Sequence, residues 1–194
     1  MKTTSARQLL LEAGKQLIWE KGYTATGIQD VLQAAGVPKG SFYHYFESKD
    51  AFVLAVLESY IQEYDTHVGH YLEDESLTPL TRLHQFVEAA SRWFASLPSY
   101  RGCIIGNLSQ ELAAYNERFR LRLAEALEQL HGHIRHCLQQ AQENDELSRD
   151  LQVDQVAHFC LNGLQGALLR MKVHQDPAPI HAFQTLLFER VLTP

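Results

Sequence analysis

The sequence contains few prolines, few cysteines and no long apolar run. Six prolines in 194 residues leave long stretches free to form helices, because proline breaks the interior of a helix. The cysteines, Cys103, Cys137 and Cys160, are odd in number and widely spaced, which does not match a disulfide framework or a zinc pair. Without a run of eighteen apolar residues or the pattern of a signal peptide, we expect a cytoplasmic protein with no membrane partner.

Basic residues are also scarce, with 17 Lys and Arg against 23 Asp and Glu and a net charge of −6. This negative balance argues against a nucleic-acid surface that extends over the whole chain, because affinity for phosphate comes from clustered Lys and Arg. The first fifty residues differ, with six basic and five acidic side chains, whereas the rest of the chain has eleven and eighteen. A surface for nucleic acid must therefore lie near the N-terminus.

Motifs of common enzymes are absent, since the chain has no G-x-S-x-G, no phosphate-binding loop and no H-E-x-x-H. We expect neither catalysis nor a bound cofactor. Two alternatives stay open. The first is a thiol-dependent enzyme that uses Cys103 with a histidine, which saturable turnover would reveal. The second is a helical dimer that binds small molecules or proteins without DNA, which a blank gel shift on the upstream DNA would favour.

Apolar residues recur at three- and four-residue spacing along nearly the whole chain, which predicts an all-α protein of about nine helices. The first helix is expected at residues 5–21, with Ser5 and Gln8 as a capping box and an apolar stripe of Leu9, Ala13 and Leu17. Thr26 is the expected cap of the second helix. The later helices are predicted at residues 27–35, a two-turn segment after Pro38, then 48–72, 78–97, 104–115, 116–142, 153–174 and 179–192.

These helices divide into a small three-helix head, residues 1–49, and a larger helical body for ligand binding and dimerisation, residues 50–194. Within the head, the stretch GVPKGSFYHYF places Phe42 and Phe46 one turn apart with Tyr45 beside them. The opposite face has the geometry of a helix-turn-helix that enters a major groove, and its residues are Lys39, Gly40, Tyr43 and His44. From spacing alone, a small core capped by Tyr43 and His44 is the alternative.

The stretch TATGIQDVLQAAGVPKGSFYHYFESKDAF closely resembles the N-terminal DNA-binding signature of the TetR family of transcriptional regulators. The similarity covers residues 7–54 and includes the Gly-Tyr after the first helix, AAGV, FYHYF and SK. The rest of the chain matches only in the number and length of its helices. The resemblance implies a nine-helix subunit, a homodimer, and repression that a small molecule relieves.

The resemblance also implies roles for residues of the head. The base-reading residue is Lys39, and the residues that permit its close approach to the groove are Pro38, Gly40 and Ser41. The phosphate backbone would be held by Thr26, Tyr43, His44 and Lys49. Gln29 and Gln33 are further candidates for DNA contact on the second helix. Because arginines are few, one head should bind weakly, so two heads about 34–36 Å apart on a palindromic operator are required.

The last two predicted helices carry the expected dimer interface. The segment LNGLQGALL has small residues on a close-approach face, and the final helix offers large apolar ones. The family dimerises through a four-helix interface of two helices per subunit, which implies contacts by Gly163, Gly166, Ala167, Phe183 and Leu187. The alternative is that these residues close the core of the subunit itself.

Aromatic residues of the body suggest a ligand pocket. Amphipathic rings can enclose a space of a few hundred Å3 with their polar tips inside, although plain core is the alternative. The inducer is not predicted. The residues concerned are Tyr60, Tyr64, Trp93, Phe94, Tyr115 and Phe119.

Cys103 is the expected sensor. It follows a glycine in the loop before the helix at 104–115, where unpaired N–H groups and Arg101 favour a thiolate. The segment GCIIGNLSQELA is similar to that of a TetR subgroup that senses electrophiles or oxidants through a cysteine at this point, while other relatives with this segment bind pocket ligands. A small buried hydrophobe is the other interpretation of Cys103. Cys137 and Cys160 lie within helices and are expected to be inert.

The segment HGHIRHC raises a metal alternative. His133, His136 and Cys137 share one helical face at i, i+3 and i+4, a spacing able to chelate zinc or copper. A fourth ligand is not evident, and histidines on exposed helices are common. We therefore predict no metal site.

Overall fold

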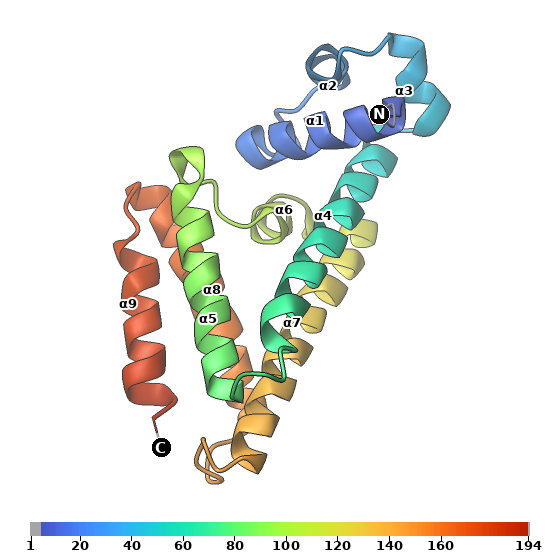
Figure 1. Ribbon diagram of the computed structural model, residues 1–194. Coiled ribbons are helices and arrows are strands. Elements are labelled where there is room, and N and C mark those ends of the chain that lie inside the picture. Colours follow the sequence, from blue (N-terminus) through green and yellow to red (C-terminus); the bar gives the residue numbers. More distant parts are fainter. Residues whose placement is uncertain (1–4, 194) are drawn as a thin grey trace. The chain divides into compact units, whose positions relative to one another are not determined.

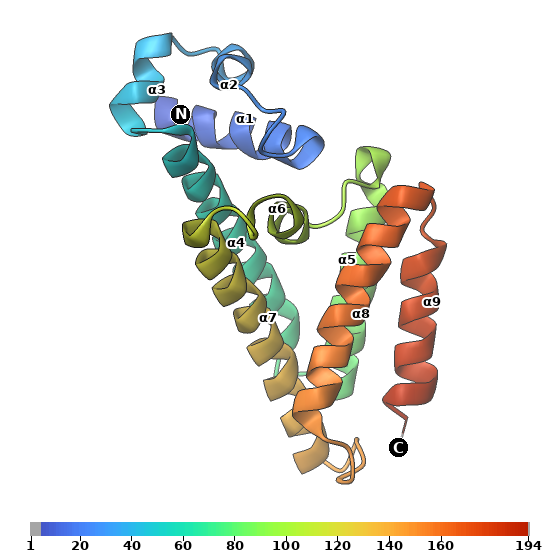
Figure 2. The ribbon, with the colours of Figure 1, turned by 180° about the vertical axis from the view of Figure 1, so that it is seen from behind.

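The computed structural model describes residues 5–193. In this range nine α-helices are joined by turns, a 3-10 segment occupies Pro98–Tyr100, a π-helical segment occupies Leu187–Val191, and no strand occurs. The all-α prediction is confirmed. The helices are α1 (Ala6–Lys21), α2 (Ile28–Ala35), α3 (Lys39–Tyr45), α4 (Lys49–Leu72), α5 (Pro79–Ser96), α6 (Ile104–Leu112), α7 (Glu117–Glu143), α8 (Val153–His174) and α9 (Ala178–Leu186) (Figures 1 and 2).

Side-chain caps explain where several helices begin. The Ser5 hydroxyl accepts a hydrogen bond from the Gln8 N–H at 3.2 Å, and the Ser48 hydroxyl accepts one from the Ala51 N–H at 3.0 Å. The start of α2 corrects the prediction for Thr26. The N-cap residue of α2 is Gly27, whose N–H donates to the Asp30 carboxylate at 3.1 Å. Pro38 likewise lies at the N-cap position of α3, one residue before the helix.

The chain forms two compact units. The first contains the chain up to Tyr64 together with Ile104–Leu123, and the second contains Asp65–Cys103 together with the chain from Ala124. Helices α4 and α7 therefore contribute residues to both units. The predicted boundary between residues 49 and 50 separates a DNA-binding head from a body for ligand binding and dimerisation. It divides the chain by function, and it stays a prediction.

The core of the first unit is aromatic. Phe42, Phe46 and Phe52 are buried, and their ring centroids lie 5.0–5.6 Å from one another. Gly14 of α1 is required for this packing, because a Cβ atom there would lie 2.3 Å from Cζ of Phe52. The buried face of α1 differs from the predicted one, because Leu9 is exposed. The buried residues of α1 are Leu10, Leu11, Gly14, Ile18 and Trp19.

In the second unit, α8 packs along α9, and Figure 2 shows the two helices side by side. Gly163 permits this contact, because a Cβ atom there would lie 2.4 Å from the ring of Phe183. A buried arginine, Arg82 of α5, donates to the carbonyl oxygen of Leu72 at 2.9 Å. Among the described residues, no helix combines the length and the apolar character needed to cross a membrane.

Candidate nucleic-acid interface and sensor site

A tight turn positions α3 relative to α2. Gly36 adopts φ +65° and ψ +30°, the left-handed conformation that favours glycine, and its N–H donates to the carbonyl oxygen of Gln33 at 3.3 Å. The N–H of Val37 donates to the carbonyl oxygen of Leu32 at 3.2 Å, which closes the end of α2. The left-handed turn at Gly36 separates two short helices as in a helix-turn-helix.

α3 has two chemically different faces. Phe42 is buried in the aromatic core, whereas the opposite face is exposed and carries Lys39, Gly40, Tyr43 and His44, as predicted. The prediction for Tyr45 was wrong, because this ring is exposed and meets the His44 ring edge-on at 4.8 Å. Because Phe42 fixes the helix from below, the cationic and hydrogen-bonding groups of the outer face are held on a rigid support.

The other predicted contact residues are mostly accessible. Gln29, Gln33 and Pro38 are exposed, and Ser41 is half-buried. Lys49 is also half-buried, and its Nζ lies 4.3 Å from the centroid of the Tyr23 ring, a cation–π contact.

Thr26 does not fit its predicted role. Only 2% of its surface is exposed, and its hydroxyl donates to the carbonyl oxygen of Gly22 at 2.7 Å. The side chain thus fixes the turn between α1 and α2 instead of presenting a hydroxyl to a phosphate.

A carboxylate of α6 holds this same turn. Glu111 accepts hydrogen bonds from the N–H groups of Tyr23, at 2.8 Å, and Thr24, at 2.6 Å. Burial alone would raise the pKa of Glu111, but these hydrogen bonds outweigh it and lower the pKa below its usual value. Gly22 belongs to the arrangement, since it has φ +80° and a Cβ atom there would lie 2.7 Å from Oε2 of Glu111.

Tyr23 is held from a second side. Its hydroxyl donates to the carboxylate of Asp50, which also accepts a hydrogen bond from Asn116 Nδ2 at 2.9 Å. The hydrogen bond to Asp50, together with burial, raises the pKa of Tyr23 to about 12. The partners lie 27 to 88 residues apart in sequence, so no local pattern could have revealed that the α1–α2 turn, α4 and α6 form one polar network.

The three cysteines differ in their surroundings. Burial raises the pKa of Cys137 to about 11 and that of Cys160 to about 12, so both are thiols at neutral pH. Cys103 is 4% exposed and directly precedes α6. Before it, Ser99 and Tyr100 have φ of 55° and 44°, a left-handed conformation that is costly for residues other than glycine. Cys103 therefore follows a strained segment.

The predicted ligand residues are divided between the two units. Within the first unit, Tyr60 and Phe119 are buried and Tyr60 stacks on Tyr64, with centroids 6.0 Å apart. Within the second unit, Phe94 is buried beside the exposed Trp93. Tyr115 is 88% exposed, which corrects its placement in an enclosed wall.

An open hollow of about 340 Å3 lies in the second unit, at the start of α8. None of the predicted ligand residues lines it. Its walls are formed by Asp150, Leu151, Gln152, Gln155, Val156, Phe159 and Val191.

The predicted interface residues divide into two groups. Gly163 and Phe183 contact each other, and Ala167 and Leu187 are buried, so these four serve the packing of the subunit itself. Gly166 is exposed, and nothing lies within 4 Å of the position of its Cβ atom. Only Gly166 of the five therefore lies free on the surface of the described chain.

The alternative metal set does not come together either. Nε2 of His133 lies 2.9 Å from the Asp65 carboxylate, whereas Sγ of Cys137 is buried and donates to the carbonyl oxygen of Pro79 at 3.1 Å. His136 is exposed. Since these contacts direct His133 toward α4 and Cys137 toward α5, the three residues do not surround one point.

Fold and surface together define an all-α regulator of the helix-turn-helix class that binds DNA. Comparison with known families agrees: residues 10–56 match the model of the bacterial regulatory proteins of the tetR family, and residues 79–187 match the tetracyclin repressor-like C-terminal domain. The chain belongs to the TetR family.

Three similar proteins illustrate this membership. The chain is 38% identical over 192 residues to the transcriptional repressor DhaR of Mycobacterium sp. (strain GP1), covering 99% of this chain and 95% of DhaR. A regulatory protein TetR from Rhodobacter sphaeroides has a TM-score of 0.89 and 38% identity, covering 95% of this chain and 97% of that one. The reduced form of Escherichia coli NemR has a TM-score of 0.88 and 27% identity, covering 95% of each chain.

Proposed function

We propose that the protein is a homodimeric transcriptional repressor that binds a palindromic operator through α3 and leaves it when a small molecule binds or Cys103 is modified. The observation that carries the proposal is the exposed face of α3, with Lys39, Tyr43 and His44 fixed above the buried Phe42. Lys39 reads a base, while Tyr43, His44 and Lys49 hold phosphates and set the register. The similarity to the repressor DhaR supports the direction of regulation.

The surface of the second unit supports dimerisation. Phe159, Gly166, Leu169 and Val173 follow one another at intervals of seven, three and four residues on α8, and all four are exposed. Leu186 adds an exposed apolar side chain on α9. A contiguous apolar face of this kind on a regulator marks an interaction surface, and a second copy would cover it in a four-helix interface.

The environment of Cys103 supports a covalent form of release. With 4% of its surface exposed, the side chain has no room for an adduct unless the segment that precedes it moves. The strained residues Ser99 and Tyr100 are suited to such a change, because relief of their backbone strain offsets part of its cost. The adduct would then select another packing of the helices, and α4, which belongs to both units, would pass the change to the head.

The first experiment tests DNA binding. Footprinting of the purified protein on the DNA upstream of its own gene should reveal a protected palindrome with two half-sites one helical turn apart. Reactive and non-reactive small molecules are then screened for release. A gel shift that stays blank across this region would contradict the proposal and favour a helical dimer that does not bind DNA.

The second experiment tests the sensor. We expect Cys103 to be alkylated at neutral pH faster than Cys137 or Cys160, whose raised pKa values keep them protonated. Mass-mapped labelling alongside gel shifts of the wild type and Cys103→Ser follows both events, and the variant should bind the operator but ignore electrophiles and hypochlorite. Slow labelling of Cys103 with intact release would overturn the covalent mechanism and leave a non-covalent ligand as the inducer.

A further inference from the structure

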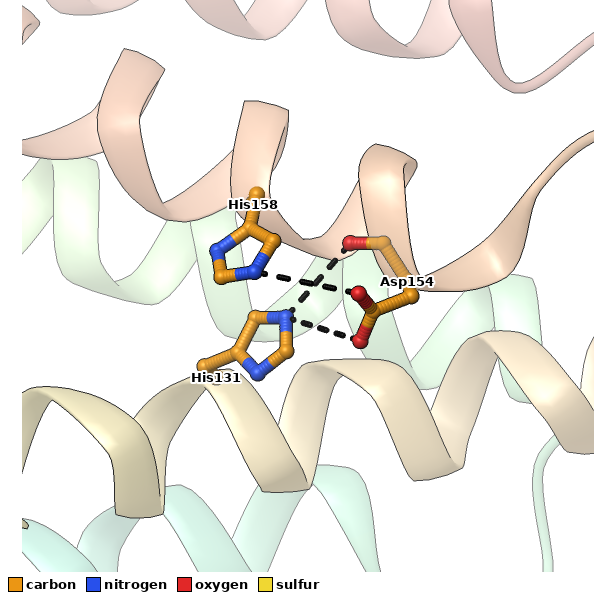
Figure 3. A group of neighbouring side chains, drawn as sticks. All are labelled: His131, Asp154 and His158. Atoms are coloured by element: carbon orange, nitrogen blue, oxygen red, sulfur yellow. Dashed lines mark hydrogen bonds and ion pairs between the residues drawn. The ribbon is translucent and has the colours of Figure 1, made fainter.

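Three side chains that the DNA-binding function does not use meet between α7 and α8 of the second unit. His131 comes from α7, and Asp154 and His158 come from the first turns of α8, with all three side chains directed toward one another (Figure 3). Nε2 of His131 lies 3.6 Å from the Asp154 carboxylate, and Nε2 of His158 lies 3.8 Å from it. The two imidazole rings stack at 3.9 Å with 18° between their planes.

We propose that these three residues form a binding site for a divalent transition metal, of which Zn2+ is the best match. Two imidazole nitrogens and one carboxylate oxygen are a common set of three protein ligands for zinc, with water in the fourth position. A set without thiolate and with a single carboxylate favours Zn2+ over Mg2+ or Ca2+, which take mainly oxygen ligands.

The spacing of the ligand atoms is close to what zinc requires. One potential ligand atom from each residue lies within 4.8 Å of the other two. Tetrahedral Zn2+ with bonds of about 2.0–2.1 Å places its ligand atoms roughly 3.4 Å apart, so a shift of about 1 Å brings the ligand atoms to this spacing. Asp154 and His158 are exposed and can rotate into place, whereas His131 is buried and provides a fixed point.

His131 has a second feature of a metal ligand. The side chain is 3% exposed, and its Nδ1 is buried without a hydrogen bond, although Oε1 of Glu128 lies only 3.3 Å away. Histidine ligands usually donate the N–H of the nitrogen that does not bind the metal to a carboxylate, which fixes the tautomer. When Nε2 of His131 binds Zn2+, Nδ1–H has Glu128 as its acceptor. The buried imidazole of His131 thus already lies between the Glu128 carboxylate on its Nδ1 side and the Asp154 carboxylate on its Nε2 side, an arrangement that suits a metal ligand.

One neighbouring cation competes for Asp154. A guanidinium nitrogen of Arg135 lies 4.0 Å from the Asp154 carboxylate, a distance at which an exposed ion pair is weak. The rival interpretation is therefore a small charge network in which Asp154 and Arg135 merely surround two stacked histidines. The rival predicts no preference for Zn2+ and no spectrum of a coordinated metal.

Metal binding would connect two helices that the chain joins only through residues 144–152. The site links the middle of α7 to the first turns of α8, so occupancy would stabilise the second unit by mass action. This effect needs neither DNA nor the sensor cysteine, and its measurement is independent of the function proposed above.

The test uses the full chain without a histidine tag, dialysed against chelator. Zn2+ affinity is measured by competition with a chromophoric chelator, and Co2+ replaces Zn2+ to give an absorption spectrum of the site. We expect one equivalent per chain and a rise in Tm of a few degrees with saturating Zn2+. His158→Ala and Asp154→Asn alter exposed residues, so they should fold yet bind Zn2+ at least tenfold more weakly and lose the visible Co2+ bands.

The matched control is His136→Ala, which removes an exposed histidine from the same helix without touching the site. Its Zn2+ affinity should equal that of the wild type. Glu128→Gln keeps all three ligands and should weaken binding about tenfold through the loss of the carboxylate acceptor. The proposal is overturned if the wild type binds no Zn2+ below millimolar concentration, or if His136→Ala loses as much affinity as His158→Ala.

Discussion

The exposed faces of α3 and α8 are built from opposite kinds of side chains. α3 presents a lysine, a tyrosine and a histidine above a buried phenylalanine, whereas α8 presents Phe159, Leu169 and Val173 beside an open glycine. Binding to a phosphate backbone requires cations and hydrogen-bond donors. Contact with a second protein surface is stabilised when it removes apolar groups from water. The two faces therefore fit different partners.

In the proposed dimer, DNA binding through the exposed face of α3 depends on the apolar face of α8. Lys39 and Lys49 are the only lysines from the start of α2 through the start of α4, and no arginine occurs there. Since each phosphate contact contributes modestly to affinity, one head should bind DNA weakly. In the proposed dimer, the apolar face of α8 would compensate for this, because joining two heads makes the second binding event intramolecular.

The largest expected effect comes from breaking the apolar face. Gly166→Arg places a long cation on this surface where nothing now lies within 4 Å. The folded subunit can accept it, but a dimer would bury the charge without a partner. We expect a monomer in light scattering and a loss of palindrome binding of at least a hundredfold.

Gly132→Arg is the control for this variant. Gly132 is the other glycine within a long helix whose Cβ position has no neighbour within 4 Å, and it lies on α7, not on α8. This control should remain dimeric. A dimeric Gly166→Arg would place the interface elsewhere.

The next effect concerns the polar face and separates base reading from phosphate contact. Lys39→Ala should weaken operator binding by about 1–3 kcal/mol and relax the sequence preference. Tyr43→Phe should weaken binding to all sequences about equally, because a phosphate contact carries no sequence information. Both are measured as Kd values on operator and scrambled DNA over a series of salt concentrations.

Lys21→Ala controls for the loss of one positive charge, since Lys21 is an exposed residue at the end of α1 and outside the predicted interface. If Lys39→Ala binds the operator as tightly as the wild type, Lys39 does not read a base.

Local patterns in the sequence were sufficient for most helix bounds and for the two faces of α3. The bounds of α8 match the prediction, because caps and periodicity act over a few residues. The same method failed in α1. Three consecutive leucines are compatible with two different apolar faces of the helix. Gly14 lies on the face that packs against Phe52, but it has no apolar side chain by which the periodicity could indicate that face.

Contacts between distant segments were beyond the sequence. Spacing within one helix suggested His133, His136 and Cys137 as metal ligands, but the site we infer joins His131 with residues of α8. Its formation depends on how α7 and α8 align, which no periodicity reveals. For the same reason Gly163 and Gly166 could not be distinguished, although one contacts Phe183 within the subunit and the other lies open.

The smallest expected effect tests whether the stability of the head depends on the charge of Glu111 in α6. All the residues concerned lie in the first unit. Glu111→Gln keeps the size of the side chain but removes the charge that accepts the N–H groups of Tyr23 and Thr24. At pH 7 we expect the free energy of unfolding to fall by about 1 kcal/mol, since Glu111 is partly exposed and hydrogen bonds to charged groups have modest net strength.

The pH dependence gives this last variant its signature. The pKa of Glu111 is lowered in the folded protein, so its contribution to stability is fully present above the unfolded value of 4.5 and is lost as the pH falls through the folded value. Urea unfolding at several pH values should therefore show wild type and Glu111→Gln converging in acid and separating at neutral pH. A difference that stays constant from neutral to acidic pH would mean that Glu111 acts through packing, and the head would then not depend on its charge.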